Sequence, residues 1–302
     1  MSSQFGEQMF NRNLTNNFKI NTLNKALMTG ALASTMALAG CQNTKPVTHP
    51  VDLKVTSHPV ANQHNDDHGH KQARWGYGAE DRLSPEDWGD LEVNKLCSAG
   101  IEQSPINIVK ATQPAATSDH ALTLIDQYNA DDFEVVNNGH TIVFTAKNPK
   151  ANVLKVNGEP YELLQFHYHV PSEHTVMSTQ YPLEIHFVHK SLDNQLAVVG
   201  VLVNAGKSNT HLQRVISDLP KKGKSGLTLL QFNVKDLMPK DSKTLAYDGS
   251  LTTPPCSERV QWLLKQTPIA ASSSQLNRLA EMYEGNNRPL QQQGERTVYY
   301  VD

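Results

Sequence analysis

The chain has 302 residues, with 30 acidic and 27 basic side chains and a formal net charge of -3 at pH 7. A balance this close to neutral gives no electrostatic basis for binding nucleic acid or an anionic membrane, so we expect no nucleic-acid partner. Hydrophobic residues make up 38% and aromatic residues 7% of the chain, which is ordinary for a soluble globular protein.

The first 40 residues are interpreted as an export signal of the lipoprotein type. Residues 26–39 form an uncharged run rich in Ala, Leu and Met, and Lys19 and Lys25 precede it. About 14 apolar residues are too few to span a bilayer but fit a secretory signal. The run ends in Leu38-Ala39-Gly40-Cys41, which resembles a bacterial lipobox. We predict a periplasmic protein that contacts a membrane only through a lipid on Cys41; ordinary cleavage in the same stretch and a buried core helix are the alternatives.

Residues 41–73 are predicted to be a disordered linker. They are rich in Pro, Asn, Asp, His, Thr and Ser and show no periodicity. The histidines and acids between His64 and His70 form a cluster that would capture metal weakly, but a solvated linker is the favoured interpretation.

The folded domain is predicted over residues 74–302, and strands outnumber helices in it. Two Asn-Gly pairs mark hairpin turns, with strand-forming runs at residues 135–136, 140–147 and 153–156. Central strands are expected at residues 162–170, 183–190 and 196–203, the last with the continuous apolar character of a strand buried on both faces.

Two helices complete the prediction, one over residues 209–219 with Pro220 as its stop and one starting near Ser274. The expected fold is mixed but mainly β: a large central, mostly antiparallel twisted sheet with short peripheral helices.

Three histidines in these central strands carry the strongest chemical signal. His167 and His169 are two residues apart, so both side chains leave the same face of a strand. If the next strand pairs with the first in an antiparallel manner, His186 joins them. Three neutral imidazoles with a fourth position open are the coordination of a catalytic zinc. The same alternation places Gln165 and Glu184 where they can accept the second ring N–H of a ligand histidine.

The sequence around these histidines resembles the α-class carbonic anhydrases, in particular the secreted or periplasmic bacterial branch. The resemblance spans about residues 75–296, and its six blocks occur in the family's order. The blocks are Trp75-Gly76-Tyr77-Gly78, Gln103-Ser104-Pro105-Ile106-Asn107, Asn137-Asn138-Gly139-His140, Gln165 to His169 with Pro171 to Thr175, Glu184 to His189, and Gly249 to Glu258 followed by Trp262.

This resemblance implies a lyase that hydrates carbon dioxide reversibly to bicarbonate and a proton, with Zn²⁺ on His167, His169 and His186. Zinc lowers the pKa of its bound water to about 7, a figure known from carbonic anhydrase itself, and the resulting hydroxide attacks the substrate. Thr252 is expected to accept a hydrogen bond from the hydroxide and to donate one to Glu173, because an ionised carboxylate only accepts.

The resemblance also implies a proton route and an apolar substrate pocket. His140 matches the family's proton shuttle, and histidine titrates nearest neutral pH. Tyr77, Asn138 and Thr253 match residues that hold ordered water between zinc and shuttle. The substrate pocket is expected to be formed by Val188, Val198, Leu251, Thr253 and Trp262.

Cys97 and Cys256 correspond to a pair that is bridged in many secreted members of the family. The bond would close a loop of about 160 residues, worth roughly 5 kcal/mol in the chain-entropy model, and an exported chain reaches an oxidising compartment. Two buried free thiols are the alternative. The oligomeric state is not readable from the sequence; bacterial relatives are often dimers, and this analogy alone favours a homodimer.

Two other functions fit parts of the pattern. His167-x-His169-x-x-x-Glu173 matches half of a cupin signature, in which Glu173 would be a ligand for iron or manganese, but the expected glycines are missing. The other is a catalytically silent carbonic-anhydrase-like domain that acts as a binding module or adhesin. The presence of the three histidines, Glu173 and Thr252 argues against that loss of activity.

Overall fold

The computed structural model describes residues 75–78, 83–283 and 285–301. The predicted export signal, the lipidation of Cys41 and the histidine-containing linker lie outside these residues. No helix within the described ranges has the length and apolar character needed to cross a bilayer.

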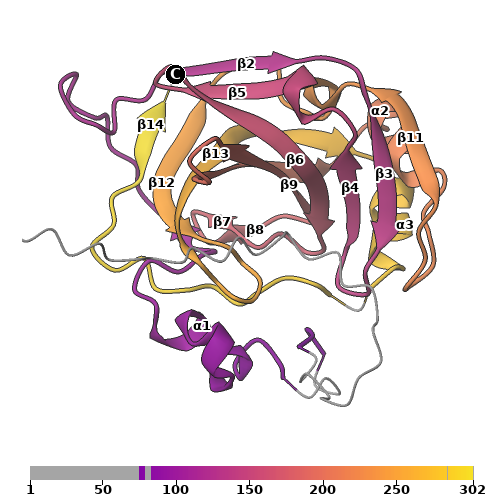
Figure 1. The fold of residues 1–302 in the computed structure, drawn as a ribbon, viewed down its shortest axis with the longest axis horizontal. Helices are drawn as coiled ribbons and strands as arrows, with labels where there is room; N and C mark the ends of the chain where they lie inside the picture. Colours follow the sequence, from indigo (N-terminus) through magenta and orange to yellow (C-terminus); the bar gives the residue numbers. More distant parts are fainter. Residues whose placement is uncertain (1–74, 79–82, 284, 302) are drawn as a thin grey trace, which may run out of the picture. The chain divides into compact units, whose positions relative to one another are not determined.

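An eleven-stranded sheet dominates the described residues (Figure 1). Its strands are β2 (Leu124–Tyr128), β3 (Asp131–Asn137), β4 (Ile142–Ala146), β5 (Asn152–Val156), β6 (Glu159–His169), β9 (Leu183–Ser191), β10 (Leu196–Ala205), β11 (Leu227–Phe232), β12 (Thr244–Ser250), β13 (Glu258–Ala271) and β14 (Tyr299–Val301). Neighbours run in the order β11-β3-β4-β6-β9-β10-β13-β12-β14, and β5 pairs with both β2 and β6.

The remaining elements are short. Strands β1 (Asn107–Ile108), β7 (Thr175–Val176) and β8 (Thr179–Gln180) form a second sheet, and the helices are α1 (Leu96–Ala99), α2 (Thr210–Ile216) and α3 (Ser273–Ala280). Single 3₁₀ turns occur at η1 (Trp88–Asp90), η2 (Glu92–Asn94), η3 (Pro149–Ala151) and η4 (Val234–Leu237). The predicted fold class, a mainly β domain with peripheral helices, is confirmed.

The pairing is mostly antiparallel, as predicted, with the parallel pairs β10–β13 and β1–β7 as exceptions. The predicted turns are present: Asn157 and Gly158 have φ of 51° and 85°, so they form the left-handed connection between β5 and β6 that Asn-Gly favours. Each predicted central strand corresponds to an observed strand, with ends that differ by a few residues.

The first predicted helix is shorter than expected. Helix α2 starts after Asn209, whose side chain accepts hydrogen bonds from the N–H groups of His211 and Leu212, and it ends at Ile216. Ser217 still has helical backbone angles, with φ of -63° and ψ of -44°, and Leu219 is the residue in which Pro220 disfavours helical backbone. Helix α3 begins as predicted, and Ser272 and Gln275 form a capping box at its start.

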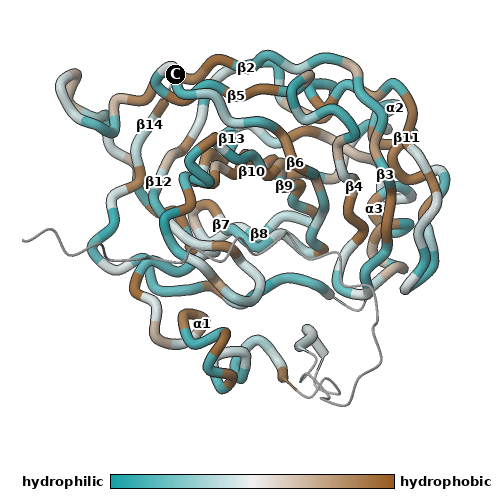
Figure 2. Tube along the Cα trace, viewed as in Figure 1, coloured by the Kyte–Doolittle hydropathy of each residue, from teal (hydrophilic) through white to brown (hydrophobic). Residues whose placement is uncertain are grey.

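One face of the central sheet, which we call the aromatic face, packs around five buried phenylalanines: Phe133, Phe144, Phe166, Phe187 and Phe232. Helices α2 and α3 cover this cluster with Leu212, Val215 and Leu279. Burying each such side chain contributes roughly 1.5–3 kcal/mol, so this face supplies much of the driving force for folding. Figure 2 shows the apolar residues along β6, β9 and β10.

The opposite face, which we call the histidine face, follows from alternation along the same strands. His167 pairs with His186 across β6 and β9, and Val188 pairs with Val198 across β9 and β10. Val198 in turn pairs with Trp262 on β13. Polar side chains are therefore buried beside aliphatic ones on this side of the sheet.

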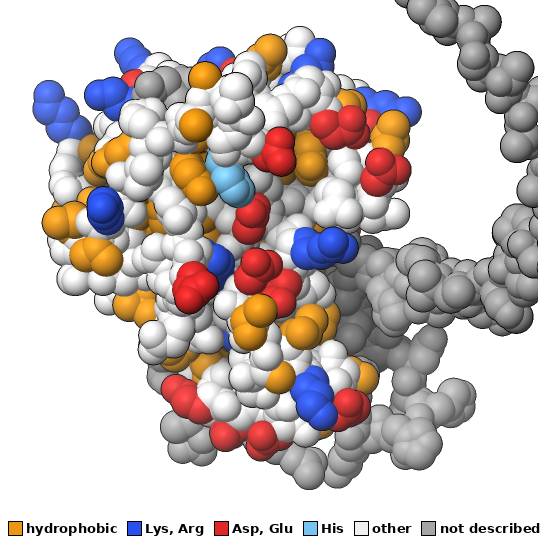
Figure 3. Space-filling view, turned by 90° about the vertical axis from the view of Figure 1, so that its left-hand side faces the viewer, with side chains coloured by type: hydrophobic (Ala, Val, Ile, Leu, Met, Phe, Trp, Pro, Cys, Tyr) orange, Lys and Arg blue, Asp and Glu red, His pale blue; other side chains and the backbone are white. Residues whose placement is uncertain are grey.

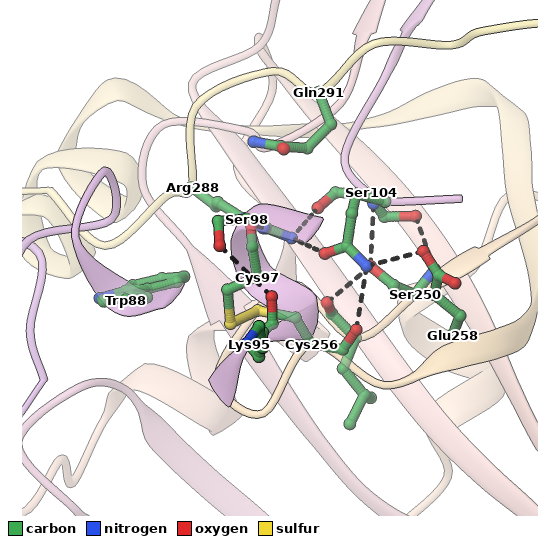
Figure 4. The surroundings of a disulfide bond; sticks show 12 residues. Trp88, Lys95, Cys97, Ser98, Ser104, Ser250, Cys256, Glu258, Arg288 and Gln291 are labelled. Atoms are coloured by element: carbon green, nitrogen blue, oxygen red, sulfur yellow. Dashed lines mark hydrogen bonds between the residues drawn. A yellow bond between two sulfur atoms is a disulfide. The ribbon is translucent and has the colours of Figure 1, made fainter. Parts of the chain in front are cut away.

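The predicted disulfide is present. The sulfur atoms of Cys97 and Cys256 are bonded, and the two Cα atoms are 5.0 Å apart (Figure 4). The bond joins α1 to the turn between β12 and β13, which also contains Thr252.

One surface of the described residues is shown in Figure 3. Lys, Arg, Asp and Glu side chains are interspersed there with separate apolar side chains. This face carries no field of a single sign, in agreement with the small net charge of -3.

Candidate metal centre and active site

The three predicted histidines converge on the histidine face. One ring nitrogen of each of His167, His169 and His186 lies within 4.8 Å of the others. The ring centroids are 5.0 Å apart for His167 and His169, 5.3 Å for His167 and His186, and 4.6 Å for His169 and His186. The register of β6 against β9 brings them together, because it sets His167 directly opposite His186.

The second nitrogen of each ring is held by a hydrogen-bond acceptor. His167 Nδ1 donates to Gln165 Oε1 at 2.8 Å, and His186 Nε2 donates to Glu184 Oε1 at 2.8 Å. His169 Nδ1 donates to the backbone oxygen of Asn286 at 2.6 Å. These acceptors fix each ring so that Nε2 of His167, Nε2 of His169 and Nδ1 of His186 remain as lone-pair donors.

These remaining nitrogens fit a metal ion. His169 Nε2 is buried and has no hydrogen-bond partner among the described residues, a condition that is costly unless something binds it. Burial lowers the pKa of all three imidazoles, that of His169 to about 4, so the rings are neutral at pH 7. Neutral imidazole is the form of histidine that coordinates metal.

A second buried group, His174, Glu184 and His186, also has close ligand atoms, but the atoms that face one another are already hydrogen-bonded. The Glu184 carboxylate accepts from His174 Nδ1 at 2.7 Å, from His186 Nε2, and from the N–H groups of Glu173 and His174. His174 Nε2 contacts Tyr247 Oη at 2.6 Å. Burial raises the pKa of Glu184, but the two imidazoles outweigh it and hold the pKa well below its usual range. This second group therefore holds the ring of His186 in place for the first group.

Glu173 and Thr252 are buried next to the imidazoles. Glu173 Oε1 accepts the backbone N–H of Arg288 at 2.8 Å. Burial raises the pKa of Glu173 to about 7, while His186, the Arg288 N–H and the Thr252 hydroxyl beside it act in the opposite direction. Glu173 Oε1 lies 3.5 Å from His169 Nδ1, the nitrogen already bonded to Asn286. Its other oxygen, Oε2, lies 3.9 Å from His186 Nδ1. The cupin alternative would require Glu173 as a ligand, but the group of mutually close ligand atoms in this part of the described residues consists of the three histidines alone.

The predicted pocket residues lie in one cluster on the histidine face. Val188, Val198 and Trp262 are buried together, and Leu251 packs against them. The Trp262 ring centroid is 4.9 Å from that of His186, and its Nε1 donates to the backbone oxygen of Ser250. The imidazoles thus adjoin an apolar wall. Thr253 is half-buried, and its backbone oxygen accepts the N–H of Cys256.

His140 begins the segment that leads into β4 and is half-buried. Its ring stacks on Trp75, with centroids 3.8 Å apart and planes inclined by 11°. Asn138 Oδ1 accepts the backbone N–H groups of His140 and Thr141, so it holds the turn that carries His140. Tyr77 packs edge-on against Trp75, which places it in the same aromatic group as His140.

Sequence reasoning missed Asn286 and Arg288, which contact His169 and Glu173 from a segment more than 100 residues further along the chain. Asn286 also binds Val170 N–H through Oδ1 and the backbone oxygens of His140 and Tyr168 through Nδ2. No periodic pattern marks this segment. The available signal was an Asn-Asn-Arg-Pro run in a stretch with no strand or helix character.

Comparisons with known proteins agree on one family. The family model described as eukaryotic-type carbonic anhydrase matches residues 83–302. A carbonic anhydrase of Klebsiella pneumoniae is 38% identical over 229 residues, which cover 75% of this chain and 90% of the relative.

Solved structures give the same result. The α-carbonic anhydrase of Photobacterium profundum has a TM-score of 0.65 at 38% identity, covering 75% of this chain and 100% of that one. The α-carbonic anhydrase of Thermovibrio ammonificans, solved in complex with the inhibitor sulfanilamide, has a TM-score of 0.68 at 36% identity and covers 76% and 99% of the two chains.

Proposed function

The chain belongs to the eukaryotic-type, or α, carbonic anhydrases, lyases that hydrate carbon dioxide reversibly and in general depend on zinc, and from this premise we propose that His167, His169 and His186 hold a Zn²⁺ ion. One observation carries the proposal: each ring has one nitrogen fixed by an acceptor, while the other converges with those of its neighbours. Three imidazole ligands and one open position define a catalytic zinc site.

Zinc bound there would supply a Lewis acid that lowers the pKa of water to about 7, the value known for carbonic anhydrase. The chain's own contribution is to keep the three ligands neutral and to fix their tautomers through Gln165, Glu184 and the Asn286 carbonyl.

Glu173 and Thr252 are proposed to orient the attacking oxygen. In its ionised form Glu173 can only accept a hydrogen bond, so the Thr252 hydroxyl must donate to it. The lone pairs of the Thr252 oxygen then remain to accept a hydrogen bond from the nucleophile. Glu173 is itself held in place, because its Oε1 also accepts the backbone N–H of Arg288.

The apolar wall is proposed as the place where carbon dioxide binds. The substrate has neither net charge nor net dipole, so it loses little by leaving water for Val188, Val198, Leu251 and Trp262. Thr253, which is half-buried, is proposed to complete this pocket.

His140 is proposed as the group that passes the product proton to buffer, with Tyr77, Asn138 and Thr253 ordering water on the way. Its half-buried ring and its place on Trp75 support the role. His140→Ala should slow turnover about tenfold in a buffer of low proton-accepting capacity, and added imidazole should restore the rate. Failure of rescue in a variant that retains zinc would contradict the shuttle.

The proposed cellular form is an exported, periplasmic enzyme. The Cys97–Cys256 disulfide supports passage into an oxidising compartment. In this proposal residues 1–40 are removed, Cys41 carries a lipid, residues 41–73 are a linker and residues 74–302 form the enzyme. Mass spectrometry of the mature N-terminus tests it: a diacylglyceryl adduct on Cys41 supports anchoring, and an unmodified N-terminus elsewhere refutes it.

The activity is tested on the purified chain by zinc analysis together with stopped-flow hydration of carbon dioxide. We expect one zinc per chain, activity lost on removal of zinc and restored on its return, and inhibition by sulfanilamide, which binds the Thermovibrio relative. A zinc-loaded protein that does not accelerate hydration would refute the proposed function.

A further inference from the structure

Arg288 is a buried cation without an ion-pair partner. The residue is 1% exposed, and no carboxylate lies within ion-pairing distance of its guanidinium in the described ranges. Burial lowers the pKa of Arg288 to about 10. Taking a guanidinium out of water without a counter-ion is costly unless hydrogen bonds compensate it. The contacts that it makes are therefore informative about why the side chain is there.

The guanidinium donates three hydrogen bonds to the segment that precedes β1. Nη2 donates to the backbone oxygen of Cys97, and Nη1 donates to Gln103 Oε1 and to the backbone oxygen of Ser104, each at 2.8 Å. The Trp88 ring lies 5.8 Å from the guanidinium carbon. A planar fork is required for this set of acceptors, and lysine cannot reproduce it.

These bonds close a ring with the disulfide (Figure 4). Gln103 accepts from Arg288 through Oε1 and donates through Nε2 to the backbone oxygen of Cys256 at 3.0 Å. Cys256 is bonded to Cys97, whose backbone oxygen accepts from Arg288. The Cys256 N–H donates in turn to the backbone oxygen of Thr253. Arg288 is thus linked, through Gln103, to the turn that carries Thr252.

The backbone of Arg288 contacts Glu173, the partner of Thr252 in the proposed orienting pair. Arg288 N–H donates to Glu173 Oε1 at 2.8 Å. The side-chain bonds of Arg288 fix where this N–H points, because they anchor the residue on two sides. Glu173 and Thr252 come from separate segments of the chain, and Arg288 is in contact with the first and linked to the turn of the second.

We propose that Arg288 is a positioning residue for the hydration of carbon dioxide. It holds Glu173 and the turn that carries Thr252 in a fixed position relative to each other. This inference rests on the proposed function of that pair. Arg288 touches no reacting atom. Its loss should lower kcat and leave KM and zinc content nearly unchanged, because the zinc ligands are held by other acceptors.

The test is a double-mutant cycle in the full chain with Arg288→Lys and Glu173→Gln. A misplacement of about 1 Å costs on the order of 10²-fold in rate, so we expect Arg288→Lys to lower kcat about ten- to a hundredfold. In the Glu173→Gln background the same substitution should lower kcat less than about threefold, because the partner that it positions no longer works.

Arg296→Lys is the matched control. Arg296 also donates to backbone oxygens, including that of Gln103 at 2.8 Å, but has no bond to Glu173. Its substitution should leave kcat within about twofold. Gln103→Met is a second variant that cuts the link to Cys256 while it keeps the arginine, and it should lower kcat by a smaller factor that also vanishes in the Glu173→Gln background.

Equal rate losses in the two backgrounds, or a rate loss in Arg296→Lys as large as in Arg288→Lys, would overturn the positioning role. So would failure of both Arg288→Lys and Gln103→Met to fold, since that outcome makes the residue structural. A wild-type chain that lacks zinc or activity would instead refute the proposed function, so the two failures are distinguishable.

Discussion

His186 and His189 lie in the same strand, β9, on opposite faces of the sheet. Both are buried, and burial lowers the pKa of both. On the aromatic face, His189 Nδ1 donates to the backbone oxygen of Phe187 and Nε2 accepts from Tyr128 Oη at 2.9 Å, so no nitrogen remains. On the histidine face, His186 uses only Nε2. Burial alone therefore does not identify a ligand; a fixed ring with one nitrogen left over does.

The same contrast extends to the two faces as a whole. The aromatic face is mainly apolar, and its contacts stabilise the fold without any added group, although the buried Tyr168 hydroxyl has no partner among the described residues. The histidine face has a buried nitrogen on His169 with no partner among the described residues and a carboxylate, Glu173, whose pKa burial raises. Sites of function keep such incomplete interactions and depend on the rest of the fold for their stability.

The largest contrast is expected from alanine at His186. His186→Ala should remove zinc and lower hydration activity by more than about a thousandfold, because water far from a metal has a pKa of 15.7 rather than about 7. His189→Asn should retain zinc and activity and lose about 1–3 kcal/mol of stability as its buried hydrogen bonds are broken. Metal analysis, stopped-flow hydration and urea unfolding measure these effects. Zinc loss in His189→Asn would erase the distinction between the two faces.

The next largest effect concerns the aromatic face. Phe166 stacks on Phe144 with ring centroids 4.4 Å apart and is buried at the centre of the cluster. Phe166→Ala should lower the free energy of unfolding by about 3–5 kcal/mol, while kcat per folded, zinc-loaded molecule stays within about twofold. Leu192→Ala, at a side chain that is 81% exposed, is the control and should change neither quantity.

A pH effect is expected from the buried histidine of the aromatic face in the zinc-free protein. Burial lowers the pKa of His189 from 6.5 to about 4, so the unfolded chain takes up a proton at higher pH than the folded chain does. The contribution of His189 to the free energy of unfolding is therefore fully present above pH 6.5. It is lost as the pH drops toward 4, by up to about 3 kcal/mol. His189→Gln removes this contribution, so its destabilisation relative to wild type should shrink between pH 7 and pH 4.5.

Urea unfolding with a chelator present measures that difference at each pH. The direction is the informative part, since a raised pKa would make the destabilisation grow rather than shrink on acidification. A difference that is constant with pH would show that His189 is not held neutral on the aromatic face.

The last prediction concerns a single hydroxyl. Thr252→Val keeps the volume but removes the group beside Glu173, so kcat/KM should fall about a hundredfold, the scale seen when one preorganised hydrogen bond to the reacting oxygen is lost. Thr244→Val makes the same change at a buried hydroxyl that donates to the Ser242 carbonyl and accepts from Lys265 Nζ, and it should cost about 1–3 kcal/mol of stability with no loss of rate. Equal rate losses would assign Thr252 a structural role.

The strands and their faces were readable from the sequence because alternation and Asn-Gly turns are local signals. Period two alone places His167 and His169 on one face, and the antiparallel pairing of β6 with β9 adds His186. Helix α2 was predicted too long because Leu219 continues its apolar pattern, whereas the helix itself ends at Ile216. The disulfide came from resemblance, since spacing alone does not pair cysteines.

The sequence by itself determined which residue types face which side of each strand, and with the family resemblance it named the candidate ligands. Only the tertiary structure decided which nitrogen of each ring stays available, because the acceptor of His169 is a backbone oxygen 117 residues away. It also brought Arg288 to Cys97 across 191 residues and to Glu173. Contacts this distant follow from how the whole sheet and its connecting segments pack, and no local pattern encodes them.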